Sequence, residues 1–397
     1  MGWKRKAGFG VLAILALGAT GFFTLAPGIV ENGQNATLPG APVPSDRALA
    51  LHKTLVIGDW HSDALLWDRD LTKRSTRGHV DLPRLREGNV ALQVFTTVTK
   101  SPSGLNYEHN SAEAADDITL LFLAQARPPR TWTNLTERAL HQAAQLQAIS
   151  NDAPDQLRII RTKSQLAQLL ADRSAGAPVV GGLLGAEGGH ALGGKMENYD
   201  RLYEAGFRLI GLTHFFDNEL GGSLHGETGT EGAGLTDFGR EVVARLIADH
   251  MVIDLAHASP AMAREVLATP GARPIVSHTG VHGHCRTQRN FTDDILKEVA
   301  AKGGVVGIGF WDEVNCANTV AAIGNSIVAA IALVGDDHVS LGSDFDGAVT
   351  TPIDSSQLAS LTQVLIDKGL SEASISKVMG GNMMRYLAEV LPEDSKS

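Results

Sequence analysis

Short apolar runs alternate with longer amphipathic segments along most of the chain. The runs are rich in Val, Ile, Leu and Gly, and each has the length of one buried strand. The segments between them repeat their apolar positions every three or four residues, which predicts helices that pack one face against a sheet. The eight runs occupy residues 54–58, 90–98, 179–185, 209–213, 251–255, 274–277, 304–310 and 338–342.

This alternation predicts an α/β fold with a parallel sheet, because parallel strands need crossover helices between them. Eight strand–helix units are the number that closes a (β/α)₈ TIM barrel. An open, doubly wound sheet stays an alternative, since a count of apolar runs does not prove closure. Residues 101–176 are too long for one connection, so we expect a helical excursion after the second strand, with helices near 112–126 and 137–149.

The first 30 residues have a different pattern, in which Lys4, Arg5 and Lys6 precede an uncharged, apolar stretch at 7–30. As a helix rising 1.5 Å per residue, such a stretch crosses about 30 Å of hydrocarbon. The basic cluster places its own side in the cytoplasm. We expect residues 1–30 to anchor the protein in a membrane with the folded domain outside the cytoplasm, periplasmic or extracellular. The alternative is a cleaved signal peptide and a secreted protein.

The rest of the chain divides by composition. Residues 31–46 are rich in Pro, Gly, Asn and Ser without periodicity, which predicts a linker. We expect residues 47–392 to form one domain and residues 393–397 a short tail. The net charge of -10 argues against nucleic acid as a partner, because no basic excess is present to neutralise phosphates. Two cysteines, Cys285 and Cys316, are too few for a Cys-rich zinc module.

Ligand-type side chains follow one predicted strand after another. In a barrel the carboxyl ends of the strands converge on one mouth, where active sites lie. Two residues that are two apart on a strand share a face, and imidazole and carboxylate groups suit zinc. Each residue alone has a plain structural interpretation, such as a capping Asp or a buried His, but together they favour a metal site. They are His61 and Asp63 after the first run, Glu187 after the third, His214, His257 and His278 after the fourth to sixth, and Asp344 after the eighth.

With their neighbours, these residues resemble the renal (membrane) dipeptidase family of zinc peptidases, within the amidohydrolase-like barrels. The motifs occur in the family's order and span residues from about 54 to 390. Trp60 departs from the pattern, since many relatives carry Gly there, and we expect its ring to reshape the mouth. The matching motifs are Asp59-x-His61-x-Asp63, Ala186-Glu187-Gly188-Gly189-His190, Leu212-Thr213-His214, Ile253-Asp254-Leu255-Ala256-His257, Ser277-His278, Arg289-Asn290 and Gly342-x-Asp344-Phe345-Asp346-Gly347.

The resemblance implies two Zn²⁺ ions, one held by His61 and Asp63, the other by His257 and His278, with Glu187 bridging them. It further implies roles for three residues around the metals. His214 would stabilise the oxyanion, Arg289 would bind the substrate's terminal carboxylate, and Asp344 would transfer a proton. Asp254 and Asp346 are candidates for orienting ligands.

The resemblance also implies a homodimer and a disulfide between Cys285 and Cys316, for which two buried free thiols are the alternative. The glycine-rich residues 221–234 should lie over the mouth as a mobile flap.

The function implied is hydrolysis of the peptide bond of dipeptides, including those with a C-terminal D-residue. A related metal-dependent amidase or β-lactam hydrolase on the same site is one alternative. A non-catalytic, membrane-anchored binding protein is another. It is disfavoured because competent residues fill all five metal-ligand positions.

Overall fold

The computed structural model describes residue 18, residues 20–228 and residues 232–394. Half of the apolar stretch at 7–30 that was predicted to be an anchor therefore lies outside the described residues, and its last residues, 26–30, begin helix α2. Within the described part, nine parallel strands form one sheet in the order β6-β5-β4-β2-β1-β9-β8-β7, with β3 paired to β4. The strands are β1 Ile57–Asp59, β2 Val90–Val98, β3 Leu157–Ile159, β4 Val180–Glu187, β5 Phe207–Gly211, β6 Val252–Asp254, β7 Val276–Thr279, β8 Val306–Ile308 and β9 Val339–Leu341.

The two end strands of this order are joined to each other. Ile275, directly before β7, donates its N–H to the carbonyl of Ile253 in β6 at 2.9 Å and accepts one from Leu255 at 2.9 Å. A parallel bridge between Asp254 and Ile275 belongs to the same contact. The sheet therefore returns on itself, as in a TIM-type barrel, and the predicted α/β class with parallel strands is confirmed.

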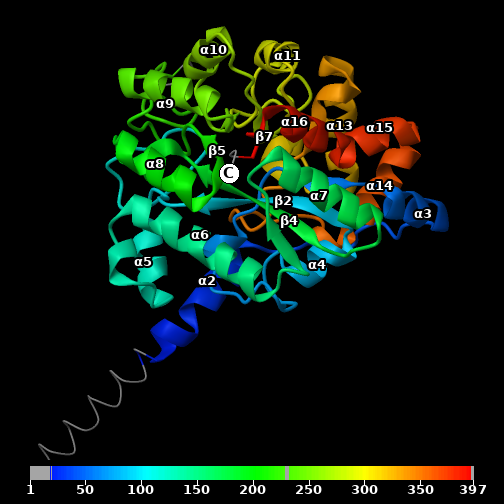
Figure 1. Cartoon of the computed structure of the whole chain (residues 1–397), viewed down its shortest axis with the longest axis horizontal. Coiled ribbons are helices and arrows are strands. Elements are labelled where there is room, and N and C mark those ends of the chain that lie inside the picture. Colours follow the sequence, from blue (N-terminus) through cyan, green and yellow to red (C-terminus); the bar gives the residue numbers. More distant parts are fainter. Residues whose placement is uncertain (1–17, 19, 229–231, 395–397) are drawn as a thin grey trace, which may run out of the picture.

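Helices surround the strands (Figure 1). Several begin at the side-chain cap that their sequence predicts; Thr236 accepts the N–H of Gly239 at the start of α9, for example. The helices are α2 Ala26–Gln34, α3 Asp46–Thr54, α4 Leu82–Glu87, α5 Asp117–Ala124, α6 Leu135–Asp152, α7 Lys163–Ser174, α8 Met196–Ala205, α9 Asp237–Ala248, α10 Pro260–Ala268, α11 Asp293–Ala301, α12 Asp312–Asn315, α13 Val320–Val334, α14 Leu358–Asp367, α15 Glu372–Ser376 and α16 Asn382–Val390.

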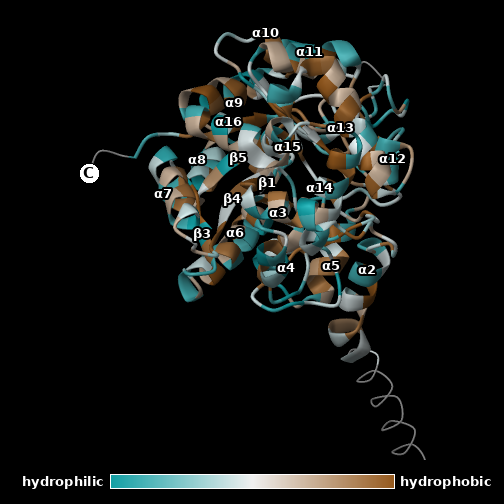
Figure 2. Ribbon diagram, turned by 90° about the vertical axis from the view of Figure 1, so that its right-hand side faces the viewer, coloured by the Kyte–Doolittle hydropathy of each residue, from teal (hydrophilic) through white to brown (hydrophobic). Residues whose placement is uncertain are grey.

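The main apolar core lies between the strands and the inner faces of these helices. It combines strand residues such as Phe95 and Ile210 with helix residues such as Leu246 and Ile323, all buried. Hydrophilic and hydrophobic patches alternate around the outer helices (Figure 2), as one-sided burial requires. A second buried cluster joins Trp60 to strand residues and to α16.

Two features of the fold differ from the sequence prediction. The excursion at 101–176 contains α5, α6 and α7 but also β3, which pairs with the amino end of β4. The sequence did not indicate β3, because three residues with a central Arg158 give no apolar run. The predicted helix near 112–126 is shorter, since Asp116 caps α5 and accepts the N–H of Ile118.

The segment predicted as a linker is partly folded against the domain. Helix α2 extends to Gln34, and its Glu31 is buried. Further on, Leu38 donates its N–H to the carbonyl of Thr351 at 2.8 Å. The prediction of a free tether over all of 31–46 was wrong, because a charged residue within the apparent linker has buried partners.

Among the residues that the structure describes, no helix has both the length and the apolar character needed to cross a membrane.

Candidate metal centre

All eight predicted site residues lie together at the carboxyl ends of the strands. Glu187 is the last residue of β4, and His278 lies within β7. His61 and Asp63 follow β1, His214 follows β5, His257 follows β6 and Asp344 follows β9; Arg289 lies in the loop between β7 and α11.

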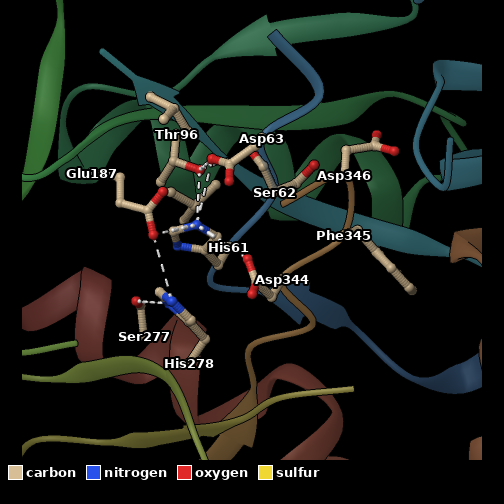
Figure 3. A network of polar contacts seen from close by, with 12 residues as sticks. His61, Ser62, Asp63, Thr96, Glu187, Ser277, His278, Asp344, Phe345 and Asp346 are labelled. Atoms are coloured by element: carbon tan, nitrogen blue, oxygen red, sulfur yellow. Dashed lines mark hydrogen bonds and ion pairs between the residues drawn. The ribbon is translucent and has the colours of Figure 1, made fainter. Parts of the chain in front are cut away.

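Glu187 is the centre of the cluster (Figure 3). Its Oε1 lies 3.3 Å from Nε2 of His61, 3.4 Å from Nε2 of His257 and 3.5 Å from Nε2 of His278. Its Oε2 lies 3.6 Å from Nε2 of His214. One carboxylate therefore faces imidazoles from four different strand ends, and each of its oxygens has its own neighbours.

The backbone after Glu187 allows this position. Gly188 has φ 93°, in the left-handed region that favours glycine. A Cβ there would also lie 2.3 Å from Cε1 of His190, so no larger residue fits without a shift.

Two site residues themselves have left-handed backbones. His257 has φ 63° and Asp344 has φ 62°, values that non-glycine residues rarely adopt. Such conformations persist only where the surroundings impose them, and they concentrate at functional sites.

His61 and Asp63 belong to the other side of the cluster. Asp63 Oδ1 lies 3.4 Å from Nε2 of His61 and 2.5 Å from Oγ1 of Thr96 in β2. Thr96 Oγ1 also lies 2.9 Å from the carbonyl oxygen of Ser62. One hydroxyl thus holds the backbone and the carboxylate of this ligand pair.

His278 is oriented from behind. Its Nδ1 lies 2.8 Å from Oγ of Ser277, while its Nε2 lies 2.9 Å from Nε2 of His257. Asp254 accepts the N–H of Ser277 at 2.8 Å, so it fixes the strand that carries His278. This agrees with the orienting role considered for Asp254.

The charges of the site depend on burial and on its carboxylates. Burial opposes a charge on His61, but Glu187 and Asp63 outweigh burial and raise its pKa well above the ordinary value. Burial lowers the pKa of His257 and His278 well below the ordinary value, which keeps both imidazoles neutral. Neutral imidazole is the form that binds metals.

The donor set fits divalent metal ions. Three groups of buried residues each bring their ligand atoms within 4.8 Å of one another: His61–Asp63–Glu187, Glu187–His257–His278 and His61–Asp254–His278. The first two share Glu187, as expected for a carboxylate between two ions. The Nδ1 atoms of His61 and His257 have no hydrogen-bond partner among the described residues. No hydrogen bond through Nδ1 therefore fixes either ring in a purely structural role.

Arg289 is buried beside this cluster, and only part of its guanidinium group is hydrogen-bonded to described residues. Its Nη2 donates to the carbonyl oxygen of His278 at 3.0 Å. Its Nε and Nη1 have no hydrogen-bond partner within the described part of the chain. The guanidinium also lies over the Trp311 ring, 5.3 Å from its centroid. Two buried donors without protein partners can bind an acceptor that a ligand or a water supplies.

A cavity of about 180 Å³ opens above the cluster. Its polar wall contains Glu187, His214, Arg289 and Asp344. Its apolar wall is lined by Val30, Leu66, Trp67, Val98, Leu105, Ile118, Leu121 and Val349. The cavity therefore combines convergent polar groups with room for an apolar side chain.

Two sequence predictions about this region were wrong. Trp60 does not reach the mouth: its side chain is fully buried, 5.7 Å from the ring of Tyr386 between centroids, in an apolar cluster. Asp346 does not orient a metal ligand, because it pairs with Arg69 and accepts the N–H of His79. Figure 3 shows it turned away from His61.

The flap predicted at 221–234 is only partly described, since residues 229–231 lie outside the described ranges. Its first part is held in place: Leu224 donates its N–H to the carbonyl of His257 at 2.7 Å, and His225 is buried. The predicted disulfide between Cys285 and Cys316 is confirmed.

Three contributors were not found from the sequence. Thr96, Tyr107 and His225 all contact or line the site. Burial raises the pKa of Tyr107 to about 12, so its hydroxyl is neutral, and the hydroxyl oxygen accepts a hydrogen bond from Nε1 of Trp311 at 3.0 Å. The signal for Thr96 was present: Thr96 and Thr97 are polar residues inside an otherwise apolar strand.

A closed parallel sheet with histidines and carboxylates gathered at its carboxyl ends is the arrangement in which barrel enzymes hold catalytic metal ions. The chain belongs to the membrane dipeptidase family, peptidase family M19, whose pattern matches residues 45–396. It is accordingly a metal-dependent dipeptidase, as the sequence resemblance implied.

Curated relatives agree with this assignment. The dipeptidase aclJ of Aspergillus oryzae is 29% identical over 356 residues, covering 84% of this chain and 77% of its own. The dipeptidase ataJ of Aspergillus terreus is 27% identical over 356 residues, covering 82% of this chain and 81% of its own.

Solved structures share the fold. The metallopeptidase called dipeptidase AC has a TM-score of 0.69 at 25% identity, covering 85% of this chain and 99% of that one. A metallopeptidase from Rhodobacter sphaeroides, liganded with a phosphinate mimic of the dipeptide L-Ala-D-Ala, has a TM-score of 0.68 at 24% identity, covering 85% of this chain and 99% of that one.

Proposed function

We propose that this protein hydrolyses dipeptides at a site for two zinc ions, with Glu187 as the ligand that both ions share. The position of Glu187 carries the proposal, because its Oε1 lies within 3.5 Å of three imidazole nitrogens. His61 and Asp63 would complete one zinc site, and His257 and His278 the other. When bound, the two ions would supply Lewis-acid activation of the attacking water and of the scissile carbonyl.

The residues around the metals would bind and orient the substrate. Arg289 would donate hydrogen bonds to the terminal carboxylate from the two buried N–H groups that lack protein partners, and a paired, charge-assisted contact of this kind is strong. His214, which lines the cavity beside Glu187, would donate a hydrogen bond to the oxyanion. Fixing both ends of the substrate favours dipeptides over longer chains.

Asp344 would move the proton. It lines the cavity, with Oδ1 3.7 Å from Nε2 of His61, so it faces the same space as the attacking water. A carboxylate at this place can take a proton from the water and give it to the leaving amine.

The preference would include dipeptides with a C-terminal D-residue. In support, the Rhodobacter sphaeroides metallopeptidase was solved with a phosphinate mimic of L-Ala-D-Ala. The panel below therefore includes dipeptides with L- and with D-residues at the C-terminal position.

The direct test is a panel of L,L- and L,D-dipeptides, a tripeptide and a β-lactam, assayed on metal-free protein before and after addition of zinc. We expect zinc to restore hydrolysis of dipeptides of both hands and not of the tripeptide. Zinc-loaded protein that leaves every dipeptide intact would overturn the proposal. Hydrolysis of the β-lactam alone would indicate the related amidase activity instead.

We further propose that the apolar N-terminal stretch keeps the protein at a membrane, with residues 47–392 outside the cytoplasm, and that the protein is a homodimer. The first rests on the basic cluster before the uncharged residues 7–25, which precede α2, the second on the family resemblance. Fractionation of the native host tests the first, since release of the protein in soluble form would contradict it. Light scattering on detergent-purified protein tests the second, and a monomer mass would contradict it.

A further inference from the structure

Helix α2 lies outside the part of the chain that matches the family, yet it borders the substrate cavity. The match begins at residue 45, whereas α2 is Ala26–Gln34. Val30 and Gln34, one helical turn apart, both line the cavity. Figures 1 and 2 both show α2 beside α5, whose Ile118 and Leu121 line the same cavity. A segment of the chain beyond the common fold therefore completes the cavity wall.

Buried ion pairs fix α2 in this position. Glu31 is 1% exposed and pairs with Nε of Arg69 and, at 2.9 Å, with Nε of Arg77. Arg69 in turn binds Asp346 at 2.5 Å. A buried carboxylate with two arginine partners is costly to displace, because separation would leave charges buried and unpaired.

The residues after α2 are attached to the loop that carries Asp344. Asn35 Oδ1 accepts the N–H of Ala348 at 2.9 Å, and the carbonyl of Ala36 accepts the N–H of Thr351 at 2.9 Å. Gly347, Ala348 and Val349 of this loop line the cavity as well. Helix α2 and the loop after β9 thus form one continuous part of the cavity wall.

We propose that α2 is a specificity-determining wall of the dipeptide cavity, in which Val30 limits the size of the apolar substrate side chain that can bind. The inference rests on the proposed dipeptidase function and adds to it. Val30 faces the same cavity as Leu66, Trp67 and Val98, so a substrate side chain among them would reach the helix. The space there is small, since the whole cavity measures about 180 Å³.

The test compares Val30→Trp and Val30→Ala with wild type on dipeptides whose two positions carry Gly, Ala, Leu, Phe or Trp. We expect Val30→Trp to lower kcat/KM at least about tenfold for substrates with Leu, Phe or Trp at the affected position, and far less for those with Gly or Ala. Val30→Ala should shift the preference the other way. Zinc content should stay unchanged in both variants, because Val30 is not one of the proposed metal ligands.

Ile29→Trp is the matched control. Ile29 precedes Val30 on the same helix, is 70% exposed and does not line the cavity, so the same enlargement there should leave the substrate profile unchanged. Equal loss for all substrates in Val30→Trp, no change in either Val30 variant, or a profile shift in Ile29→Trp would each overturn the role of α2. Wild-type protein that cleaves no dipeptide would instead overturn the proposed function itself.

Discussion

A single hydroxyl group shows how residues outside the predicted set shape the site. Thr96 Oγ1 holds Asp63 Oδ1 at 2.5 Å and the Ser62 carbonyl at 2.9 Å, and it lies 3.3 Å from Nε2 of His61, so it fixes the predicted ligand pair. Partners of this kind restrict a ligand to one orientation, and their loss typically weakens metal binding.

We therefore predict that Thr96→Val lowers zinc affinity by about 10–100-fold, as expected when a partner that orients a ligand is removed. The change keeps the shape of the side chain and removes the donor. Zinc affinity is measured by competition with a chelator. Thr97→Val is the matched control, since Thr97 is equally buried on β2 and its hydroxyl has no hydrogen-bond partner among the described residues. Equal affinities in the two variants would contradict the role given to Thr96.

The sequence allowed the candidate metal ligands to be predicted, but it said less about the residues that orient them. His61, Glu187 and His257 were recognisable because each lies two or three residues after an apolar run, where a polar residue needs a reason. The direction of a side chain next to such a run was harder to predict. Trp60 and Asp346 lie beside site residues in sequence, but packing and ion pairing turn both away.

Among the elements, the connection from β7 to α12 depends on a covalent bond. Cys285 and Cys316 are 31 residues apart in sequence and join the loop that carries Arg289 to the end of α12. Asn290 reinforces the loop by donating to the carbonyls of Cys285 at 2.9 Å and Val314 at 3.1 Å. This bond and these contacts hold the guanidinium of Arg289 over the cavity.

Reduction of this disulfide should lower the free energy of unfolding by about 2–4 kcal/mol, the usual effect of opening a loop of this size. It should also raise KM for dipeptides more than it lowers kcat, because Arg289 acts in binding. Chemical denaturation and kinetics with and without reductant measure both effects. The chain has only two cysteines, so reductant acts on no other bond. Unchanged stability after confirmed reduction would contradict this prediction.

Elements with strong periodicity were predicted well, and short or unusual ones were not. The eight apolar runs correspond to β1, β2 and β4–β9. By contrast, β3 has three residues and no apolar pattern, and its strand state comes from pairing with β4. The packing of residues 31–38 against the domain could not be predicted for a related reason. The residues that bind this segment, Arg69 and Thr351, are remote from it in sequence.

For the whole molecule, closure of the sheet is what brings the site together. Residues from His61 to Asp344 are far apart in the chain, but parallel strands send all their carboxyl ends to one side. The sequence could predict this convergence from strand number and from the repeated position of the ligand-type residues. It could not predict the cavity wall, because α2 and α5 come from the two segments without a regular strand–helix pattern.

The central claim, a two-zinc site bridged by Glu187, is tested most directly by counting metal ions. Metal-free protein would be titrated with zinc, and bound metal measured by elemental analysis, for wild type and Glu187→Gln. The account predicts two tightly bound equivalents per chain in wild type and fewer than two in the variant, because the bridging carboxylate contacts both ligand pairs. A wild-type protein that binds one equivalent or none, or a variant that retains two with unchanged affinity, would contradict it.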